Sequence, residues 1–219
     1  MLHPFDKLTV DTFAGPYVIE LHYDLDAAAP NYTDDGGLVY LGDARTTSAR
    51  HGDASPIIDD LLTARSVHND NLYDHEMRSG AAIARYLKLR YGLAGILEVT
   101  RSGDRYRTAT PSADRYRRIE GMAWAPADTT APEDYSRGTV ATYDAWANSE
   151  VYGYIVTAPD GREVTSCWDF YADPDEPFTA QAPLGLAHML DEARAAVAED
   201  SAERIAQANT VGAGIIGLI

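Results

Sequence analysis

Alternation of apolar and polar residues predicts strands in both the first and the last third of the chain. In residues 17–23 the odd positions are tyrosine or aliphatic and the even positions are mostly polar, which is the period of a strand with one buried face. A strand over residues 8–13 precedes it across an Ala14-Gly15-Pro16 turn. Shorter strands are expected at 38–41, 95–100, 105–108 and 121–124.

Apolar residues at helical spacing predict four helices. Ser55 and Pro56 have the chemistry of a helix start and predict one over residues 55–62, and Gly92 supplies a stop for a second over 73–91. Carboxylates in the first turn favour a third over 131–148. The fourth and longest is expected over 183–208, followed by an apolar, glycine-rich end.

Residues 151–168 predict a β-hairpin. Its two strands flank Pro159-Asp160-Gly161, where proline pre-sets φ and glycine tolerates a positive φ. We expect Tyr154, Ile155 or Cys167 in the core of this hairpin. The order of elements predicts an α+β fold with a mostly antiparallel sheet and packed helices, in which this hairpin is followed by the long helix.

A linker-like stretch between Ala125 and Thr130 predicts a domain boundary. Residues 1–125 would form an N-terminal α+β region with a basic Arg/Tyr segment, and residues 126–219 an acidic helix-hairpin-helix region. A single domain is the alternative, since 219 residues suffice for either arrangement.

The net charge of −16 is distributed unevenly along the chain. Residues 1–70 have a net charge of −8, residues 71–125 of +4, and residues 126–219 of −12. Such an excess of acid repels phosphates, so direct binding of duplex DNA is not expected. Only two of the 18 basic residues are lysine, which indicates a GC-rich or salt-adapted host. Either origin would by itself explain an acidic chain, without any role of the acids in function.

Composition also indicates where the protein acts. The lone Cys167 excludes an internal disulfide and fits a reducing compartment. No apolar run reaches the roughly 18 residues that cross a bilayer, and the N-terminus lacks a basic region followed by an apolar run. We therefore expect a cytoplasmic protein without membrane contact.

Catalytic signatures are absent from the sequence. It has no nucleophile elbow, no phosphate-binding loop and no dinucleotide-binding glycine motif. The ligand-type residues of the 68–76 run lack the spacing of a metalloprotease site, and helix capping by Asn71 or Asp74 explains them more simply. A reactive thiol at Cys167, activated by His188 from the following helix, is a weaker possibility for a catalytic site. No catalytic residue, cofactor or metal is predicted.

The basic middle of the chain repeats Asp-Arg-Tyr-Arg at residues 104–107 and 114–117. Arginine can pair with phosphate and tyrosine can stack on a base, which would suit RNA, a nucleotide or an acidic partner. The candidate phosphate-binding residues are Arg105, Arg107, Arg115 and Arg117. The interpretation we favour is that these arginines pair with the chain's own acids.

Acidic residues crowd the end of the hairpin and the long helix that follows. Duplex DNA carries one charge per about 1.7 Å of axis, and an acidic protein face can approach that density. The candidate partner-binding residues are Asp169, Asp173, Asp175, Glu176, Asp191, Glu192, Glu199 and Asp200. Plain solubility is the alternative reason for these charges.

One segment resembles a known group of sequences. Tyr143-Asp144, Val151-Tyr152-Gly153-Tyr154, Asp160-Gly161, Ser166-Cys167-Trp168 and Phe170-Tyr171 resemble the C-terminal part of uncharacterised proteins of bacteriophages and conjugative plasmids. The chain departs from their pattern at Thr165, Asp169 and Ala172, where the group usually has aspartate, glycine and glycine. The resemblance implies a mobile-element context and transfers no catalytic residue.

These observations favour a non-enzymatic, acidic mobile-element protein. Its expected partner is a host protein with a basic nucleic-acid-binding surface, such as a defence or transcription protein, which it would bind as a DNA mimic. Two alternatives stay open: a nucleotide- or RNA-binding protein or enzyme that uses the Arg/Tyr segment, and a virion or assembly component whose apolar end docks as a strand. Self-association into a homo-oligomer is also compatible with the sequence.

Overall fold

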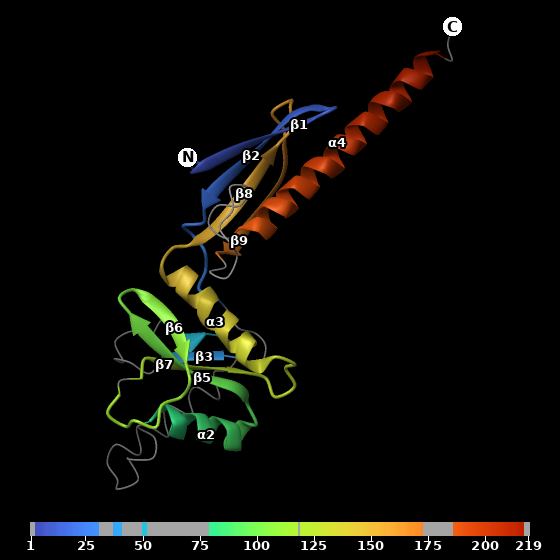
Figure 1. The fold of residues 1–219 in the computed structure, drawn as a ribbon. Coiled ribbons are helices and arrows are strands. Elements are labelled where there is room, and N and C mark those ends of the chain that lie inside the picture. Colours follow the sequence, from blue (N-terminus) through green and yellow to red (C-terminus); the bar gives the residue numbers. More distant parts are fainter. Residues whose placement is uncertain are drawn as a thin grey trace. The chain divides into compact units, whose positions relative to one another are not determined.

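The computed structural model describes residues 3–30, 37–40, 50–51, 79–117, 119–172 and 186–216 (Figure 1). The chain divides into two compact units, the first made of Met1–Ala27 with Ser149–Ile219 and the second of Ala28–Asn148. The first is called the hairpin unit below, and the second the central unit. The boundary that the sequence predicted near Ala125 therefore falls inside the central unit, because the N-terminal hairpin pairs with the C-terminal one.

The hairpin unit is a four-stranded antiparallel sheet in the order β1-β2-β8-β9 (Figure 1). Its strands are β1 (Asp6–Thr12), β2 (Gly15–Tyr23), β8 (Val151–Thr157) and β9 (Glu163–Tyr171). Strand β2 pairs with β8 in a register that places Leu21 opposite Tyr154. This pairing joins two hairpins that lie far apart in the sequence.

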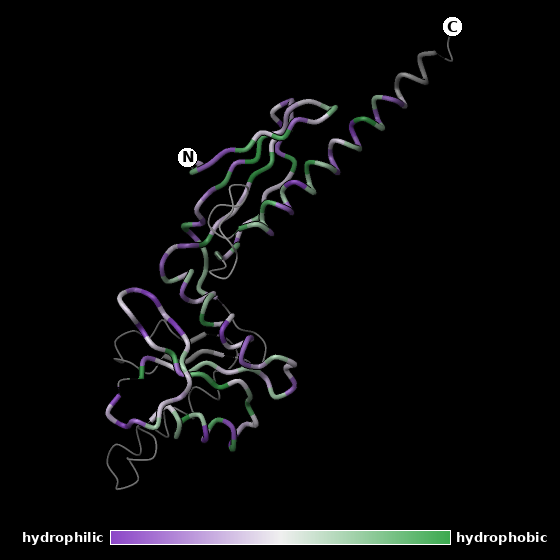
Figure 2. Tube along the Cα trace, viewed as in Figure 1, coloured by the Kyte–Doolittle hydropathy of each residue, from purple (hydrophilic) through white to green (hydrophobic). Residues whose placement is uncertain are grey.

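Helix α4 (Ala187–Ile216) covers one face of this sheet. Alternation selects the buried side of each strand, and Figure 2 shows apolar residues along the central strands. The core residues are Tyr17, Ile19, Leu21, Tyr152, Tyr154, Val156 and Phe170 from the strands, with Leu186, Met189, Leu190, Ala193 and Val197 at and after the helix start. The helix continues beyond the sheet, and residues 206–210 are exposed (Figure 1).

The central unit is a five-stranded antiparallel sheet in the order β4-β3-β7-β5-β6. Its strands are β3 (Gly37–Tyr40), β4 (Arg50–His51), β5 (Ala94–Ser102), β6 (Arg105–Ala109) and β7 (Gly121–Ala125). Every residue of β7 is buried, since Met122 and Trp124 pack with α2 (Gly80–Tyr91) and Ala123 packs with α3 (Pro132–Ala147). The two helices thus cover opposite faces of the sheet, and the predicted α+β class with antiparallel sheet is confirmed.

Local chemistry accounts for the helix ends, and for α2 the sequence predicted the end at Gly92 but not the start after Ser79. Helix α2 begins after Ser79, whose Oγ accepts the Ala82 N–H at 3.2 Å, and ends at Gly92, which has a φ of +70°. Helix α3 begins with Pro132, as its predicted start implied. Helix α4 is longer than predicted and reaches Ile216. The predicted helix over 55–62 and the first part of the one over 73–91 lie outside the described residues.

The predicted β-hairpin is confirmed as β8 and β9, with a helix on each side in the sequence. Tyr154 is buried in the core at 4% exposure, and Cys167 packs against the core while half-buried. Ile155 is half-buried, and it pairs with Ser166. Strand alternation places Ile155 on the sheet face opposite α4.

Candidate functional site

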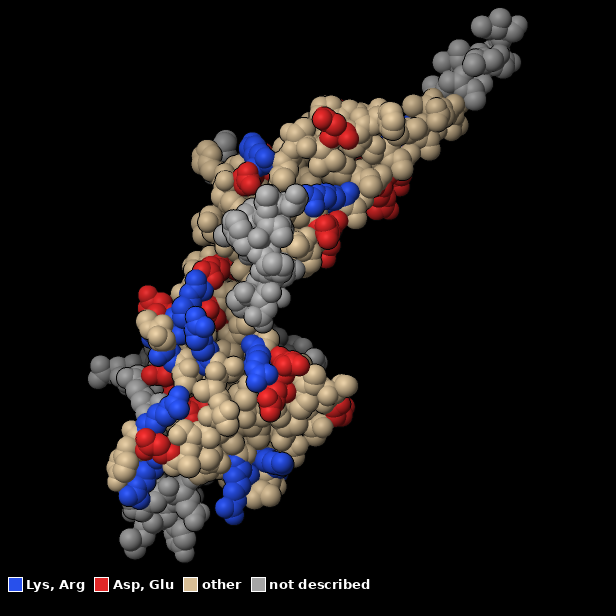
Figure 3. All heavy atoms as spheres, viewed as in Figure 1, with Lys and Arg blue, Asp and Glu red and all other residues tan. Residues whose placement is uncertain are grey.

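Negative charge is concentrated in the hairpin unit. This unit contains 17 acidic and 4 basic residues, a net charge of −13, whereas the central unit contains 17 acidic and 14 basic residues, a net charge of −3. The concentration arises because β1 and β2 bring the N-terminal acids into the same unit as the acidic C-terminal third. Figure 3 shows acidic and basic side chains intermingled on the visible face of the central unit.

Helix α4 presents carboxylates on its solvent side. Glu192, Glu199 and Glu203 are exposed and have no basic partner among the described residues, while Asp191 lies 3.5 Å from Arg194. The three glutamates are separated by seven and four residues, so they share one stripe, with spacings of about 10 and about 6 Å along the helix axis. The stripe is held on a single rigid element.

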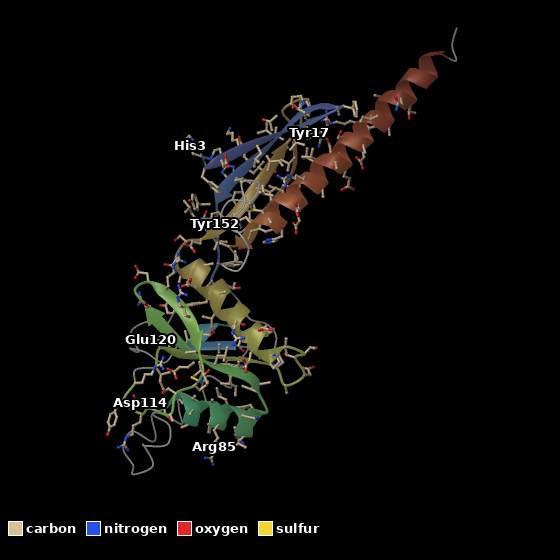
Figure 4. The ribbon with its side chains drawn as sticks, in the orientation of Figure 1. His3, Tyr17, Arg85, Asp114, Glu120 and Tyr152 are labelled. Carbon is tan, nitrogen blue, oxygen red and sulfur yellow. The ribbon has the colours of Figure 1, made fainter. Side chains whose placement is uncertain are left out.

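Asp200, which the sequence analysis placed among the partner-binding residues, pairs instead with residues of its own unit. Its Oδ2 accepts the Tyr17 hydroxyl at 2.7 Å and Arg204 Nε at 2.9 Å, and its Oδ1 pairs with Arg162 at 2.5 Å. Arg204 also reaches Asp160 in the β8–β9 turn at 2.7 Å. We call these five residues the α4 clamp, because they tie the middle of the helix to the sheet (Figure 4 labels Tyr17).

Hydrogen bonds and burial set the protonation of the α4 clamp. The hydrogen bond from Tyr17 holds the pKa of Asp200 below its ordinary value, and the hydrogen bond from Arg204 does the same for Asp160. Burial raises the pKa of the Tyr17 hydroxyl. At neutral pH the clamp therefore contains two carboxylates, two guanidinium groups and a neutral phenol.

Asp169 lies at an irregularity of β9. The register between β8 and β9 shifts after Tyr152, and Asp169 has a φ of +65°, in the left-handed region that glycine adopts most readily. At this position the chain departs from the pattern that it is predicted to resemble. The Asp169 side chain is exposed, and its N–H donates to Asp24 Oδ2 at 3.4 Å. Asp173, Asp175 and Glu176 lie outside the described residues.

The first Asp-Arg-Tyr-Arg copy belongs to the edge strand β6. Asp144 on α3 accepts the Tyr106 N–H at 2.6 Å and pairs with Arg105 at 3.2 Å, so one carboxylate binds both residues. The Tyr106 ring packs on Tyr143 with centroids 5.0 Å apart. The Arg107 side chain is exposed and has no partner among the described residues.

The second copy lies in the loop between β6 and β7. Its Arg117 reaches Glu98 Oε1 at 3.2 Å, and Glu98 is a fully buried carboxylate on β5. Arg115 lies over the ring of the exposed Tyr116. The four predicted arginines thus divide, since Arg105 and Arg117 are paired with two different internal acids while Arg107 and Arg115 have no acidic partner among the described residues. No four-arginine phosphate cradle forms.

Packing accounts for four of the residues that carry the resemblance, all of them on β8 and β9. A side chain at Gly153 would meet the Trp168 indole, because a Cβ there would lie 2.3 Å from Cε3. Tyr152 and Tyr154 enter the core on the other face of the sheet. These four residues therefore serve the packing of one hairpin, and their presence does not by itself mark a binding site. Tyr143 and Asp144 lie on α3 instead, and Asp160 belongs to the α4 clamp.

His22 is a buried residue that the sequence did not single out. It is 2% exposed, its ring lies 5.9 Å from Trp168, and neither ring nitrogen has a hydrogen-bond partner among the described residues. Its Nε2 is 3.5 Å from Glu20, which pairs with Lys7 at 2.5 Å. In the sequence, only the alternation of β2 pointed to this residue. That alternation places Glu20 and His22 on the sheet face away from α4.

Other candidate chemistry finds little support in the described ranges. No three His, Cys, Asp or Glu side chains among these residues gather closely enough to hold a metal ion. The predicted 68–76 run lies outside them. Cys167 Sγ is 3.9 Å from the Trp168 carbonyl oxygen, and the His188 ring packs on Phe170 at 5.3 Å. Within the same ranges, no helix has the length and apolar character needed to cross a membrane.

Comparison with known proteins yields no relative: no family model matches the chain, and neither a curated protein nor a solved structure is significantly similar to it. The functional argument therefore depends on the geometry and charge described above. The resemblance to proteins of mobile elements stays a prediction.

Proposed function

We propose that this chain is a non-enzymatic binding protein whose hairpin unit contacts a basic, nucleic-acid-binding surface on a partner protein in place of DNA. The observation that carries this proposal is the net charge of −13 in the hairpin unit, against −3 in the central unit. Plain acidity for solubility requires no such separation, because charges spread over both units would serve equally well.

The spacing of the α4 carboxylates supports the same function. Glu192, Glu199 and Glu203 are exposed, have no described basic partner and lie about 10 and about 6 Å apart along the axis. Phosphates of one DNA strand recur every 3.4 Å or so of axis, so these distances approximate three and two phosphate steps. Because these side chains stand on a helix, binding need not order the backbone that carries them.

Context from the resemblance supports a particular class of partner. Phage and plasmid proteins of small size and high acidity include factors that oppose host defence, so a defence or transcription protein of the host fits best. This support is an association and does not follow from the geometry. The association does indicate which cells to use as the source of the partner, namely bacteria.

Both alternatives are weaker than this proposal in structural terms. An enzyme or nucleotide-binding protein with four arginines around a phosphate is disfavoured, since two of them neutralise internal acids. A docking strand at the apolar end is disfavoured too, because residues up to Ile216 belong to α4.

Capture of the partner followed by charge variants tests the proposal. The tagged chain is used to capture proteins from a bacterial lysate, and captured proteins are identified by mass spectrometry. Affinity for a captured protein is then compared between wild type and the combined variant E192Q/E199Q/E203Q. We expect the variant to bind at least tenfold more weakly, because three desolvated charge pairs are lost.

A matched control separates this stripe from general acidity. The variant D128N/E133Q/D134N removes three exposed carboxylates from the central unit and changes the net charge equally. We expect its affinity to stay within about twofold of wild type, with unfolding curves recorded for both variants. If both variants lowered the affinity for the partner equally, only the total charge of the chain would matter and not the position of the α4 carboxylates. That result would overturn the proposal.

A further inference from the structure

The loop 112–117 of the central unit is held at both ends by one buried carboxylate. Glu98 Oε2 accepts the Ser112 N–H at 2.9 Å, and Glu98 Oε1 lies 3.2 Å from Arg117 Nε. The Glu98 side chain is fully buried, while the Arg117 side chain that reaches it is 41% exposed. Ser112 also accepts the Ala81 N–H of α2 through its carbonyl oxygen at 2.9 Å. The loop is therefore fixed to both the sheet and the helix.

Hydrogen bonds inside the loop shape its tip. Asp114 Oδ1 accepts the Tyr116 N–H at 2.9 Å, and the Asp114 N–H donates to Ser112 Oγ at 3.1 Å. Arg115 lies 4.9 Å from the centroid of the Tyr116 ring and donates to its hydroxyl at 2.9 Å. Tyr116 is 83% exposed, so the ring face away from Arg115 is open to solvent.

Helix α2, which contacts the start of this loop at Ser112, adds positive charge to the same unit. It contains Arg85, Lys88 and Arg90 and no acidic residue, and its first turn contacts the loop through Ala81. Arg85 and Lys88 are exposed and have no side-chain partner among the described residues. Figure 4 labels Arg85 on α2 and Asp114 on the neighbouring loop. The surface formed by Arg85, Lys88, Arg115 and Tyr116 is called the loop–α2 surface.

We propose that the loop–α2 surface binds single-stranded nucleic acid. The cations pair with backbone phosphates, and the open face of the Tyr116 ring stacks on a base. An unpaired base presents its whole face for stacking, whereas a base in a duplex is already stacked on its neighbours. Arg115, on the other face of the ring, keeps the platform in place and adds charge.

Overall acidity does not prevent this contact. The hairpin unit has a net charge of −13, and the central unit has only −3. At moderate salt, charges more than about 10 Å from a bound phosphate are largely screened, so the groups nearest the phosphate contribute most to the interaction. The proposal goes beyond the proposed function, because it concerns the other unit and a different ligand.

Fluorescence anisotropy with a labelled oligothymidine of about 12 nucleotides tests the proposal. We expect saturable binding by the full chain that weakens from about 50 to about 200 mM salt. Tyr116→Leu should weaken binding about five- to 100-fold, whereas Tyr116→Phe keeps the ring and should stay within about threefold. The Arg115→Gln variant should reduce the salt slope by about 0.7.

Controls assign any binding to this surface. The variant Arg137→Gln removes an exposed arginine that pairs with Glu133 and Asp134 on α3, and it should leave affinity and salt slope unchanged. No saturable binding, or equal affinity of wild type and Tyr116→Leu, would overturn the proposal. Displacement of the oligonucleotide by polyglutamate, with Tyr116→Leu still fully active, would instead identify a surface for an acidic protein.

Discussion

Gly153 on β8 and Trp168 on β9 depend on each other at the scale of single residues. A Cβ at position 153 would lie 2.3 Å from the indole and 2.8 Å from the Cys167 carbonyl oxygen. The aromatic ring covers the backbone that glycine leaves bare. The motif thus encodes a packing requirement of one hairpin, which is why local sequence can reveal it without revealing a function.

Gly153→Ala should destabilise the protein by about 1–3 kcal/mol, because the new methyl group overpacks the site. The penalty should fall in a Trp168→Ala background, since the indole is then absent. Gly138 on α3 is the control: an added Cβ meets no atom within 4 Å, so Gly138→Ala should stabilise by about 0.5–1 kcal/mol. Urea unfolding of the four variants measures these changes, and equal effects at the two glycines would contradict the packing account.

At the scale of elements, sequence patterns predict what is local and miss what pairs across long separations. Alternation in residues 17–23 and the stop at Gly92 are confirmed as β2 and the end of α2. The β2–β8 pairing joins strands that are more than 100 residues apart, and no local pattern specifies it. The division of the chain into two compact units, with breaks after Ala27 and Asn148, follows from that pairing.

The sequence predicted which residues could form the candidate site, but not which of them are exposed and which are paired inside the fold. Exposure of the α4 carboxylates follows from helical periodicity, whereas the internal role of Asp200 depends on Tyr17, 183 positions away. Likewise, the two Asp-Arg-Tyr-Arg copies are alike in sequence, yet one forms an edge strand and the other a loop. Their acidic partners, Asp144 and Glu98, come from elements that only the fold brings near.

The α4 clamp predicts how pH changes stability. The pKa values of Asp160 and Asp200 are lowered in the folded state, so their contribution is present above the ordinary pKa of about 4 and is lost as the pH falls through the folded values. The pKa of Tyr17 is raised, so its contribution is present below about pH 10 and is lost as the pH rises through the folded value.

Unfolding by urea across this pH range checks the α4 clamp. The wild-type midpoint should fall at both ends. Tyr17→Phe should flatten the alkaline fall and also reduce the acidic one, because the Tyr17 hydroxyl no longer lowers the pKa of Asp200. Asp200→Asn should flatten the acidic fall. An acidic limb of the same size in Asp200→Asn and wild type would show that other carboxylates govern acid unfolding.

At the scale of the whole molecule, the fold gathers acid into one unit and leaves the other nearly balanced. The two proposed surfaces follow this separation, with carboxylates on α4 and an Arg/Tyr loop beside α2. Since each surface has its own variants, failure of one proposal leaves the other to be judged on its own data.

Competition with duplex DNA for the captured partner tests the central claim most directly. The partner is immobilised, the chain is supplied near its dissociation constant, and duplex DNA is titrated at low salt. The account predicts complete displacement of wild type, and a fall of log affinity with log salt that is steeper for wild type than for E192Q/E199Q/E203Q. Binding that persists unchanged under saturating DNA, with no dependence on salt, would contradict the claim that the acidic unit takes the place of nucleic acid.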